Sequence, residues 1–208
     1  MVPSPGRRAV FLDRDGTLIH DPGYLDDPEG VRLLPGVADA LGALTDHGFL
    51  LVVVTNQSGI ARGRYTVEHY VAVAARLGTL LAAQGLEIEA TYYCPYHPDG
   101  TVERFAREHE DRKPSAGMWR RAAHDLDLDL GASYTLGDGE RDVVAGKRAG
   151  TTTILLAGGR DKWPLPVGGP YDPDFVARDM REAVLWILLR EGLHVPDQAG
   201  EALSRDRP

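Results

Sequence analysis

A series of short, continuous apolar runs, alternating with helix-like segments, constrains the fold of this chain more than any other feature. Continuous apolar runs are typical of strands that are covered on both faces, as in a parallel sheet. Strands that alternate with helices predict a doubly wound sheet. The five predicted strands are Ala9–Leu12, Phe49–Val54, Ile88–Tyr93, Ser133–Leu136 and Thr152–Leu156. The sequence therefore predicts an α/β, Rossmann-like fold with helices on both faces of one parallel sheet.

The segments between these runs carry residues that start and stop helices. Pro35 and Gly36 precede a helix that Gly48 ends, and Thr66 is a suitable N-cap for a helix reaching about Gly85. The later helices are expected from Ser115, as N-cap, to Leu126, over Glu140–Ala149 and over Met180–Arg190. No long segment is left over between these elements, so we expect no large cap domain.

Length and composition indicate one globular domain and exclude several classes of protein. The 208 residues suit a single domain over 1–197 followed by a polar tail over 198–208. A net charge of -8 argues against a nucleic-acid partner, which needs a basic face. No apolar stretch approaches the roughly 20 residues of a membrane span. The single cysteine, Cys94, fits a reducing compartment, so we expect a cytoplasmic monomer without a membrane partner.

Polar residues follow three of the predicted strands at the point where each ends. Asp13 and Asp15 come after the first strand, Thr55 after the second and Asp138 after the fourth. In doubly wound sheets the ligand crevice lies beyond the carboxyl ends of the strands. These residues are therefore expected to meet at one edge of the sheet.

Two carboxylates at one strand end require a partner. At ~4 Å, two like charges repel by roughly 4 kcal/mol at an effective dielectric of about 20, so they need a cation or a shared proton. Asp13 is then a candidate nucleophile toward phosphorus, and Asp15 a candidate acid that protonates the leaving oxygen. Asp138 adds oxygen ligation of the kind that Mg²⁺ prefers. The alternatives are an Asp/Gly turn after the strand and, for Asp138, a Gly-Asp-Gly turn or helix N-cap.

Three further groups are compatible with phosphate chemistry. Residues 55–59, Thr-Asn-Gln-Ser-Gly, offer hydroxyl, amide and backbone donors for a phosphate. Lys113 precedes a predicted helix and can neutralise a phosphoryl group, although Arg112 and Lys113 also read as solvated surface. Asp142, one helical turn after Asp138, can hold a metal-bound water or can simply face the helix dipole.

Together these residues resemble the four motifs of the haloacid dehalogenase (HAD) superfamily of phosphatases. The motifs are Asp13-x-Asp15-Gly16-Thr17, Thr55, Lys113 and Gly137-Asp138-x-x-x-Asp142. Residues 11–17 (FLDRDGT) and 55–63 (TNQSGIARG) are similar to the branch that acts on heptose 1,7-bisphosphate and histidinol phosphate. The resemblance spans roughly residues 9–156.

The resemblance implies a role for each motif residue. Asp13 would be the nucleophile and Asp15 the general acid/base, with Mg²⁺ held by Asp13, the backbone carbonyl of Asp15 and Asp138. Asp142 would stand behind these ligands. The residues implied to bind phosphate are Thr55, Asn56 and Lys113, and those implied to bind the rest of the substrate are Arg112, Gln57, Ser58 and a flap over Asp21–Tyr24.

The resemblance implies a magnesium-dependent phosphomonoesterase acting on a small phosphorylated sugar. We expect the 7-phosphate of D-glycero-D-manno-heptose 1,7-bisphosphate, because the insert from Cys94 to Asp111 is long and Arg112-Lys113-Pro114 matches the heptose enzymes. The alternatives are a histidinol-phosphate phosphatase or another small-molecule phosphatase, including a nucleic-acid 3′-phosphatase that the acidic charge disfavours. A non-catalytic phosphate-binding protein is a further alternative.

One loop departs from that branch, whose members carry a structural zinc site of the form Cys-x-His followed by Cys-x-Cys. Here Cys94 is present, but Tyr96 occupies the next ligand position and His97 is displaced by one residue. His109 and Asp111 stand where the paired cysteines belong. A closed zinc site needs four Cys or His ligands, so we expect this degenerate loop to hold its shape without Zn²⁺.

Overall fold

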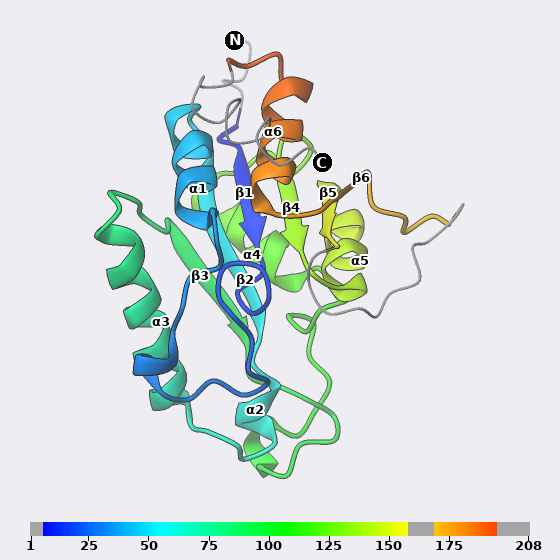
Figure 1. The fold of residues 1–208 in the computed structure, drawn as a ribbon. Coiled ribbons are helices and arrows are strands. Elements are labelled where there is room, and N and C mark those ends of the chain that lie inside the picture. The colour runs from blue at the N-terminus through cyan, green and yellow to red at the C-terminus, as the bar shows by residue number, and fades with distance from the viewer. Residues whose placement is uncertain (1–5, 158–168, 195–208) are drawn as a thin grey trace.

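A computed structural model of the chain, which describes residues 6–157 and 169–194, contains a single six-stranded sheet whose strands are all parallel. The strand order is β3-β2-β1-β4-β5-β6 (Figure 1). The chain first adds strands on one side of β1, up to β3, and then adds β4 to β6 on the other side. The strands are β1 (Ala9–Leu12), β2 (Leu50–Asn56), β3 (Ala90–Cys94), β4 (Tyr134–Gly137), β5 (Thr152–Leu156) and β6 (Phe175–Ala177). The predicted doubly wound α/β fold is confirmed.

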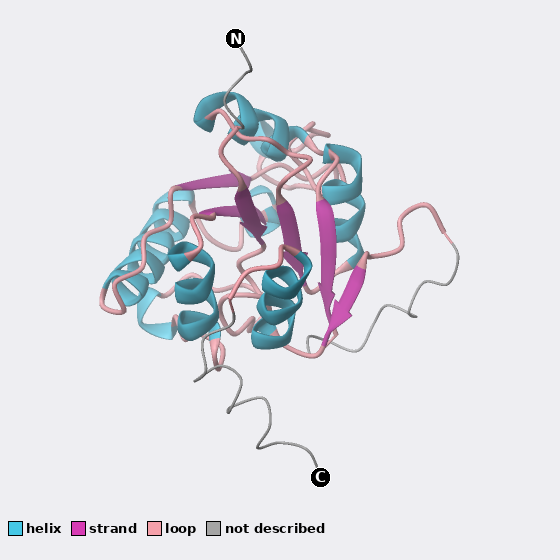
Figure 2. Cartoon of the chain, turned by 90° about the horizontal axis from the view of Figure 1, so that it is seen from above, coloured by secondary structure: helices cyan, strands magenta, loops and turns pink. Residues whose placement is uncertain are grey.

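The helices cover both faces of the sheet, as Figure 2 shows from above. The α-helices are α1 (Val37–Asp46), α2 (Ser58–Ala61), α3 (Val67–Ala82), α4 (Gly117–Leu126), α5 (Glu140–Ala149) and α6 (Met180–Arg190). Two short 3₁₀ helices, η1 (Pro28–Gly30) and η2 (Glu103–Phe105), lie in the connecting loops. Among residues 6–157 and 169–194, no helix has the length and apolarity needed to cross a membrane.

Successive residues of β1 enter two separate cores, which explains why its sequence is apolar throughout. Val10 and Leu12 pack with α1, α3 and α6 on one face of the sheet. Phe11 packs with Val52, Val54 and Trp119 on the other face, under α4 and α5. Every residue of β1 is fully buried. Because β1 is buried on both faces, the polar residues Asp13 and Asp15 can stand only beyond its carboxyl end.

Helix boundaries agree with most of the start and stop residues in the sequence. Thr66 caps α3, with its hydroxyl accepting from the His69 N–H, and Asp179 caps α6 in the same way through Glu182 N. Gly150 ends α5 in the left-handed conformation (φ 91°) that glycine adopts readily. These contacts fix where each helix enters and leaves the rim of the sheet.

Three details differ from the sequence expectation. The predicted N-cap Ser115 is wrong: Ala116 occupies that position without a side-chain cap, because the turn closed by Ser115 N and the Arg112 carbonyl delays the start of α4 to Gly117. Strand β6 and the one-turn helix α2 were not predicted, since each is too short for a periodic pattern. The predicted polar tail over 198–208 lies outside the described residues.

Candidate active site

The motif loops converge beyond the carboxyl end of β1, where the order in which the chain adds strands to the sheet reverses. Gly16 has a left-handed backbone (φ 80°), and a Cβ there would lie 2.1 Å from Asp138 Oδ2. Only glycine lets the loop after β1 turn this closely against the loop after β4. At the start of the same loop, Asp13 N donates to the Leu136 carbonyl of β4 at 3.0 Å. The expected meeting of the strand ends is therefore present.

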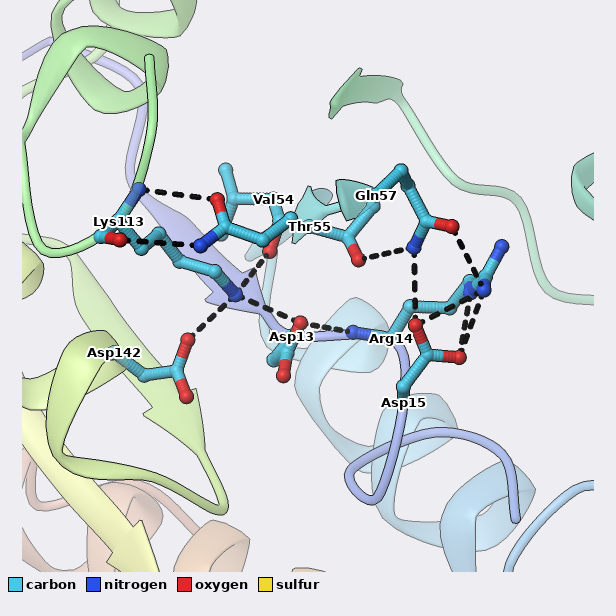
Figure 3. Close-up of polar contacts among 9 residues, drawn as sticks. Asp13, Arg14, Asp15, Val54, Thr55, Gln57, Lys113 and Asp142 are labelled. Carbon is cyan, nitrogen blue, oxygen red and sulfur yellow. Dashed lines mark hydrogen bonds and ion pairs between the residues drawn. The ribbon is translucent and has the colours of Figure 1, made fainter. Parts of the chain in front are cut away.

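A buried lysine links two of the predicted carboxylates (Figure 3). Lys113 Nζ lies 2.7 Å from Asp13 Oδ1 and 2.6 Å from Asp142 Oδ1, and it also donates to the Val54 carbonyl at 3.0 Å. Although burial opposes the charge, Asp13 and Asp142 together raise the pKa of Lys113, so its ammonium stays protonated. Both described hydrogen bonds to the Asp13 carboxylate, from Lys113 Nζ and Arg14 N, fall on Oδ1. This arrangement leaves Asp13 Oδ2 turned away from the lysine.

Three carboxylates form a group that suits a divalent cation. One oxygen each of Asp13, Asp138 and Asp142 lie within 4.8 Å of one another, the one such His/Cys/Asp/Glu group among the described residues. Burial, reinforced by the charges of Asp13 and Asp142, raises the pKa of Asp138 to about 7. Burial raises the pKa of Asp142 to about 6 in the same way, although Lys113 opposes this shift. An all-oxygen donor set with surplus negative charge fits Mg²⁺. Asp142, expected behind the metal ligands, lies within the group itself.

Asp15 is held on the opposite side of the loop by a bidentate ion pair. Arg14 Nε donates to Asp15 Oδ1 at 2.9 Å, and Arg14 Nη2 donates to Oδ2 at 2.9 Å. Gln57 Nε2 adds a third donor to Asp15 Oδ2 at 3.0 Å. Burial nevertheless raises the pKa of Asp15, with Arg14 opposing and Asp13 reinforcing the shift. A carboxyl with a raised pKa is suited to carrying a proton.

Two of the predicted phosphate-binding residues also order the site. Asn56 exchanges a pair of hydrogen bonds with the Lys113 backbone, donating to its carbonyl at 3.1 Å and accepting from its N–H at 3.0 Å. This pair fixes the Lys113 segment to the end of β2. Thr55 is buried, and its hydroxyl accepts a hydrogen bond from Gln57 Nε2 at 2.8 Å. Gln57, expected to touch substrate, is itself buried, and its amide is occupied by neighbouring side chains.

A polar cavity of about 640 Å³ opens over these groups. Its walls include most of the predicted residues, namely Asp13, Asp15, Asp21, Tyr24, Asn56, Ser58, Lys113 and Asp138. Glu140 and Arg141, which the sequence interpretation did not single out, also line it. Four other predicted residues are not among its wall residues, namely Thr55, Gln57, Arg112 and Asp142. The cavity is large enough for a sugar phosphate.

The predicted flap contributes an aromatic side to the cavity. The Tyr24 ring is 42% exposed, and its centroid lies 6.3 Å from that of Tyr65. Gly59 lies beneath both rings, and a Cβ at this position would come within 2.2 Å of the Tyr65 ring. The Arg64 guanidinium lies 5.7 Å from the Tyr24 centroid. The flap is thus supported by the segment that follows β2.

The segment 94–111, called here the insert loop, is held by contacts among its own side chains and by hydrogen bonds to neighbouring segments. The rings of Tyr96 and His109 stack at 4.3 Å, and the Arg107 guanidinium lies 4.3 Å from the Tyr96 centroid. Phe105 packs edge-on against Tyr96 at 5.8 Å. Arg112 Nη1 donates to the Tyr96 carbonyl at 3.2 Å, which ties Arg112 to this loop.

The four degenerate zinc-loop residues each have other partners. Cys94 is fully buried at the end of β3, and burial raises the pKa of its thiol. His97 Nε2 lies 3.0 Å from Arg62 Nη2, and burial, with Arg112 and Arg62, lowers the pKa of His97. Asp111 accepts from Arg121 Nη1 at 2.6 Å, and His109 stacks as described. The absence of bound Zn²⁺ stays a prediction, and the contacts show how the loop is shaped.

Arg14 and Tyr65 are the important residues that sequence reasoning missed. In an extended segment Arg14 would point away from Asp15, but the tight turn at Gly16 brings its guanidinium back onto that carboxylate. The sequence Asp-Arg-Asp offers one signal, because a buried arginine next to two carboxylates is expected to form an ion pair with one of them. Tyr65 donates its hydroxyl hydrogen to Gln57 Oε1 at 2.6 Å, and no pattern in the sequence indicates this contact.

Comparison with known proteins places this geometry in a family. Residues 111–183 match the family model described as HAD-hydrolase-like. The chain is 39% identical over 174 residues to the D-glycero-beta-D-manno-heptose-1,7-bisphosphate 7-phosphatase of Yersinia pestis, covering 84% of this chain and 92% of that protein. It is 43% identical over 154 residues to the corresponding alpha-heptose enzyme of Burkholderia mallei, covering 74% and 82%.

A solved structure supports the same grouping. The D,D-heptose 1,7-bisphosphate phosphatase of B. bronchiseptica, crystallised with magnesium and phosphate, is 30% identical and superposes with a TM-score of 0.73. The match covers 88% of this chain and 99% of that one. Sequence, fold and the four motifs agree, and the chain belongs to the haloacid dehalogenase superfamily.

Proposed function

We propose that this protein is a magnesium-dependent phosphomonoesterase that removes the 7-phosphate of D-glycero-D-manno-heptose 1,7-bisphosphate. The observation that carries the proposal is the grouping of three carboxylates, Asp13, Asp138 and Asp142, around a buried ammonium: Lys113 lies between Asp13 and Asp142, and Asp13, Asp138 and Lys113 line the cavity. A nucleophilic carboxylate, a fixed ammonium and a cation-binding group together suit phosphoryl transfer.

The first half of the reaction uses both acids at the end of β1. Asp13 Oδ2 attacks the phosphorus atom, an aspartyl-phosphate forms, and the bond from phosphorus to the sugar oxygen breaks. Asp15 gives its proton to the departing oxygen, a role that fits its raised pKa. The Lys113 ammonium, which lines the cavity, would stabilise the charge on the transferring group, and the resemblance assigns the same role to the Thr55 hydroxyl.

The second half returns the enzyme to its starting state. Asp15, now ionised, takes a proton from water, and the resulting hydroxide attacks phosphorus and releases inorganic phosphate from Asp13. The residues that would hold Mg²⁺ are Asp13, Asp138 and the backbone carbonyl of Asp15, with Asp142 beside them. When bound, the cation neutralises charge on the phosphoryl oxygens and keeps Asp13 ionised.

The choice of substrate rests on the relatives and on the shape of the site. Relatives at about 40% identity are named for both anomers of the heptose bisphosphate, so the proposal extends to the heptose without specifying the anomer. Arg141 is the only basic wall residue besides Lys113 among the described residues, and Lys113 is already paired. We assign Arg141, together with the nearby Arg112, to the phosphate that is not cleaved.

A phosphate-release screen tests the proposal. The purified protein is assayed against heptose 1,7-bisphosphate in both anomers, histidinol phosphate and common sugar monophosphates, with Mg²⁺ or with a chelator. We expect release from the heptose bisphosphate at the highest kcat/KM, and none with the chelator. A higher kcat/KM for histidinol phosphate, or release that does not depend on a divalent cation, would contradict the proposal.

A further inference from the structure

The side-chain amide of Gln57 has all its hydrogen-bonding capacity occupied. Its two N–H groups donate to Asp15 Oδ2 at 3.0 Å and to Thr55 Oγ1 at 2.8 Å. Its carbonyl oxygen accepts from Arg14 Nη2 at 3.2 Å and from the Tyr65 hydroxyl at 2.6 Å. Gln57 therefore joins the proposed proton donor to the proposed phosphate-binding hydroxyl (Figure 3).

The chemistry of the partners allows only one orientation of this amide. Arginine can only donate, so the Gln57 oxygen must face Arg14, and this orientation directs the amide nitrogen to Asp15 Oδ2 and Thr55 Oγ1. Tyr65 consequently has to donate its proton to the Gln57 oxygen. Burial raises the pKa of the Tyr65 hydroxyl, which keeps that proton in place.

Burial and packing keep these groups from exchanging partners. Gln57 and Arg14 are 1% and 2% exposed, and Tyr65 is 7% exposed in a small cluster with Ile60 and Tyr70. The Gln57 backbone is also fixed, because its N–H donates to the Cys94 carbonyl at 2.8 Å. Without the Tyr65 hydroxyl, one of the two hydrogen bonds to the Gln57 oxygen is lost, and the amide can rotate away from Asp15.

We propose that Tyr65 and Gln57 are positioning residues that set the placement of the Asp15 carboxyl for proton transfer to the leaving group. Neither side chain is expected to touch substrate: Gln57 lies beneath the cavity, and Tyr65 acts through Gln57. The inference rests on the proposed phosphatase function, because it assigns these residues to the proton-transfer step of that reaction.

The proposal predicts a loss that depends on the leaving group. A sugar alkoxide is a poor leaving group and needs a proton from Asp15, whereas p-nitrophenolate departs without one. A general acid typically contributes 10²–10⁴-fold to rate. Because Tyr65→Phe displaces Asp15 without removing it, we expect a loss below that range, a fall of roughly tenfold in kcat/KM for the sugar bisphosphate, with kcat/KM for p-nitrophenyl phosphate nearly unchanged.

The chain offers a matched control for this substitution. The Tyr70 hydroxyl is buried in the same cluster and has no hydrogen-bond partner, so Tyr70→Phe removes the same atom without removing a contact. We expect Tyr70→Phe to behave as wild type on both substrates. The Tyr65→Phe, Gln57→Leu double variant should be no slower on the sugar substrate than Gln57→Leu alone, because Tyr65 acts through Gln57.

Three results would overturn the proposal: equal losses on both substrates, no loss on either, or additive losses in the double variant. Thermal melting of each variant, measured at the assay pH, shows whether the fold is intact. Failure of this inference is distinguishable from failure of the proposed function. If the wild-type protein prefers a different alkyl phosphate, the same leaving-group comparison is made with that substrate and keeps its meaning.

Discussion

The strand-end rim and the insert loop are built in different ways, and among the described residues those of the rim line the cavity, except Thr55, whereas those of the insert loop do not. The rim, defined by Asp13, Asp15, Thr55 and Asp138, is positioned by the parallel register of β1, β2 and β4. The insert loop is shaped by stacked and charged side chains centred on Tyr96, and its Thr101 and Val102 N–H groups donate to the Ala61 carbonyl of α2.

This difference suggests that the rim carries out the reaction and that the insert loop influences which substrate binds. Residues fixed by the sheet hold the reacting groups at constant separations, which a phosphoryl transfer site requires. A loop outside the sheet can be rebuilt without disturbing the rim, and here Tyr96 and His109, which stand at positions where the resemblance implies metal ligands, stack on each other. Changes in the rim should therefore abolish turnover, whereas changes in the loop should alter stability and substrate affinity.

The largest expected effect is that of Asp13→Asn in the rim. The amide cannot form the aspartyl-phosphate, so we expect kcat to fall by at least about 10³-fold. Because asparagine has the same shape and the Lys113 contact can persist at the amide oxygen, circular dichroism and thermal melting should show an intact fold. Near-normal turnover by this variant would break the distinction between rim and loop.

A second prediction concerns the pH dependence of stability in the metal-free protein. The pKa of Asp138 is about 7 in the folded state, against an ordinary value of 3.8. The folded state therefore binds this proton more tightly than the unfolded state does, and stability should fall as pH rises from about 4 to about 7. Above this range Mg²⁺ should restore the melting temperature.

Asp138→Asn is the control for that pH dependence. It removes the titrating group, so the metal-free variant should melt at a higher temperature than wild type at pH 8 and should respond less to Mg²⁺. Differential scanning fluorimetry over this pH range measures both properties. An unchanged slope in the variant would mean that other groups produce the pH dependence.

A moderate effect is expected from Tyr96→Ala in the insert loop. The substitution removes the stack on His109 and the contact with Arg107, so we expect the free energy of unfolding to fall by about 2 kcal/mol. Arg112 can still donate to the carbonyl of residue 96, but that carbonyl is no longer fixed by the ring contacts of Tyr96. KM for the sugar bisphosphate should rise several-fold with little change in kcat, and a large loss of kcat would assign the loop to the chemistry itself.

The smallest effect is expected from Cys94→Ala. The thiol packs in the core cluster of Phe11 and donates one weak described hydrogen bond, to the Tyr96 carbonyl at 3.9 Å, so the free energy of unfolding should change by about 1 kcal/mol and kcat should not change. Elemental analysis of the wild-type protein should find no stoichiometric zinc. Zinc that is present in wild type and lost in this variant would show that the insert loop is a metal site after all.

The elements of the fold that could be predicted are those whose burial leaves a clear apolar pattern in the sequence. Strands such as Thr152–Leu156 and helices such as Glu140–Ala149 were predicted with the boundaries that the structure shows, because continuous apolar runs and terminal glycines mark them. Strand β6 has only three residues, and its pairing with β5 is a tertiary contact that leaves little local pattern.

The site was predictable at strand ends and much less so between them. Asp13, Asp15 and Asp138 follow from the strand count, and the resemblance added Lys113. The interaction of Gln57 with Asp15 and Tyr65 depends on how a turn folds back, which spacing in the sequence does not reveal. The same reason explains why Arg141, facing the cavity one residue before Asp142, was missed.

Trapping the covalent intermediate tests the central claim most directly. The protein is mixed with the sugar bisphosphate and Mg²⁺, quenched in acid during turnover, digested with trypsin and analysed by mass spectrometry. Cleavage after Arg8, Arg14 and Arg32 places Asp13 and Asp15 on different peptides, 9–14 and 15–32. The account predicts the added mass of one phosphoryl group on peptide 9–14 and none on that peptide in Asp13→Asn. A phosphoryl group on peptide 15–32, or on neither peptide during active turnover, would contradict it.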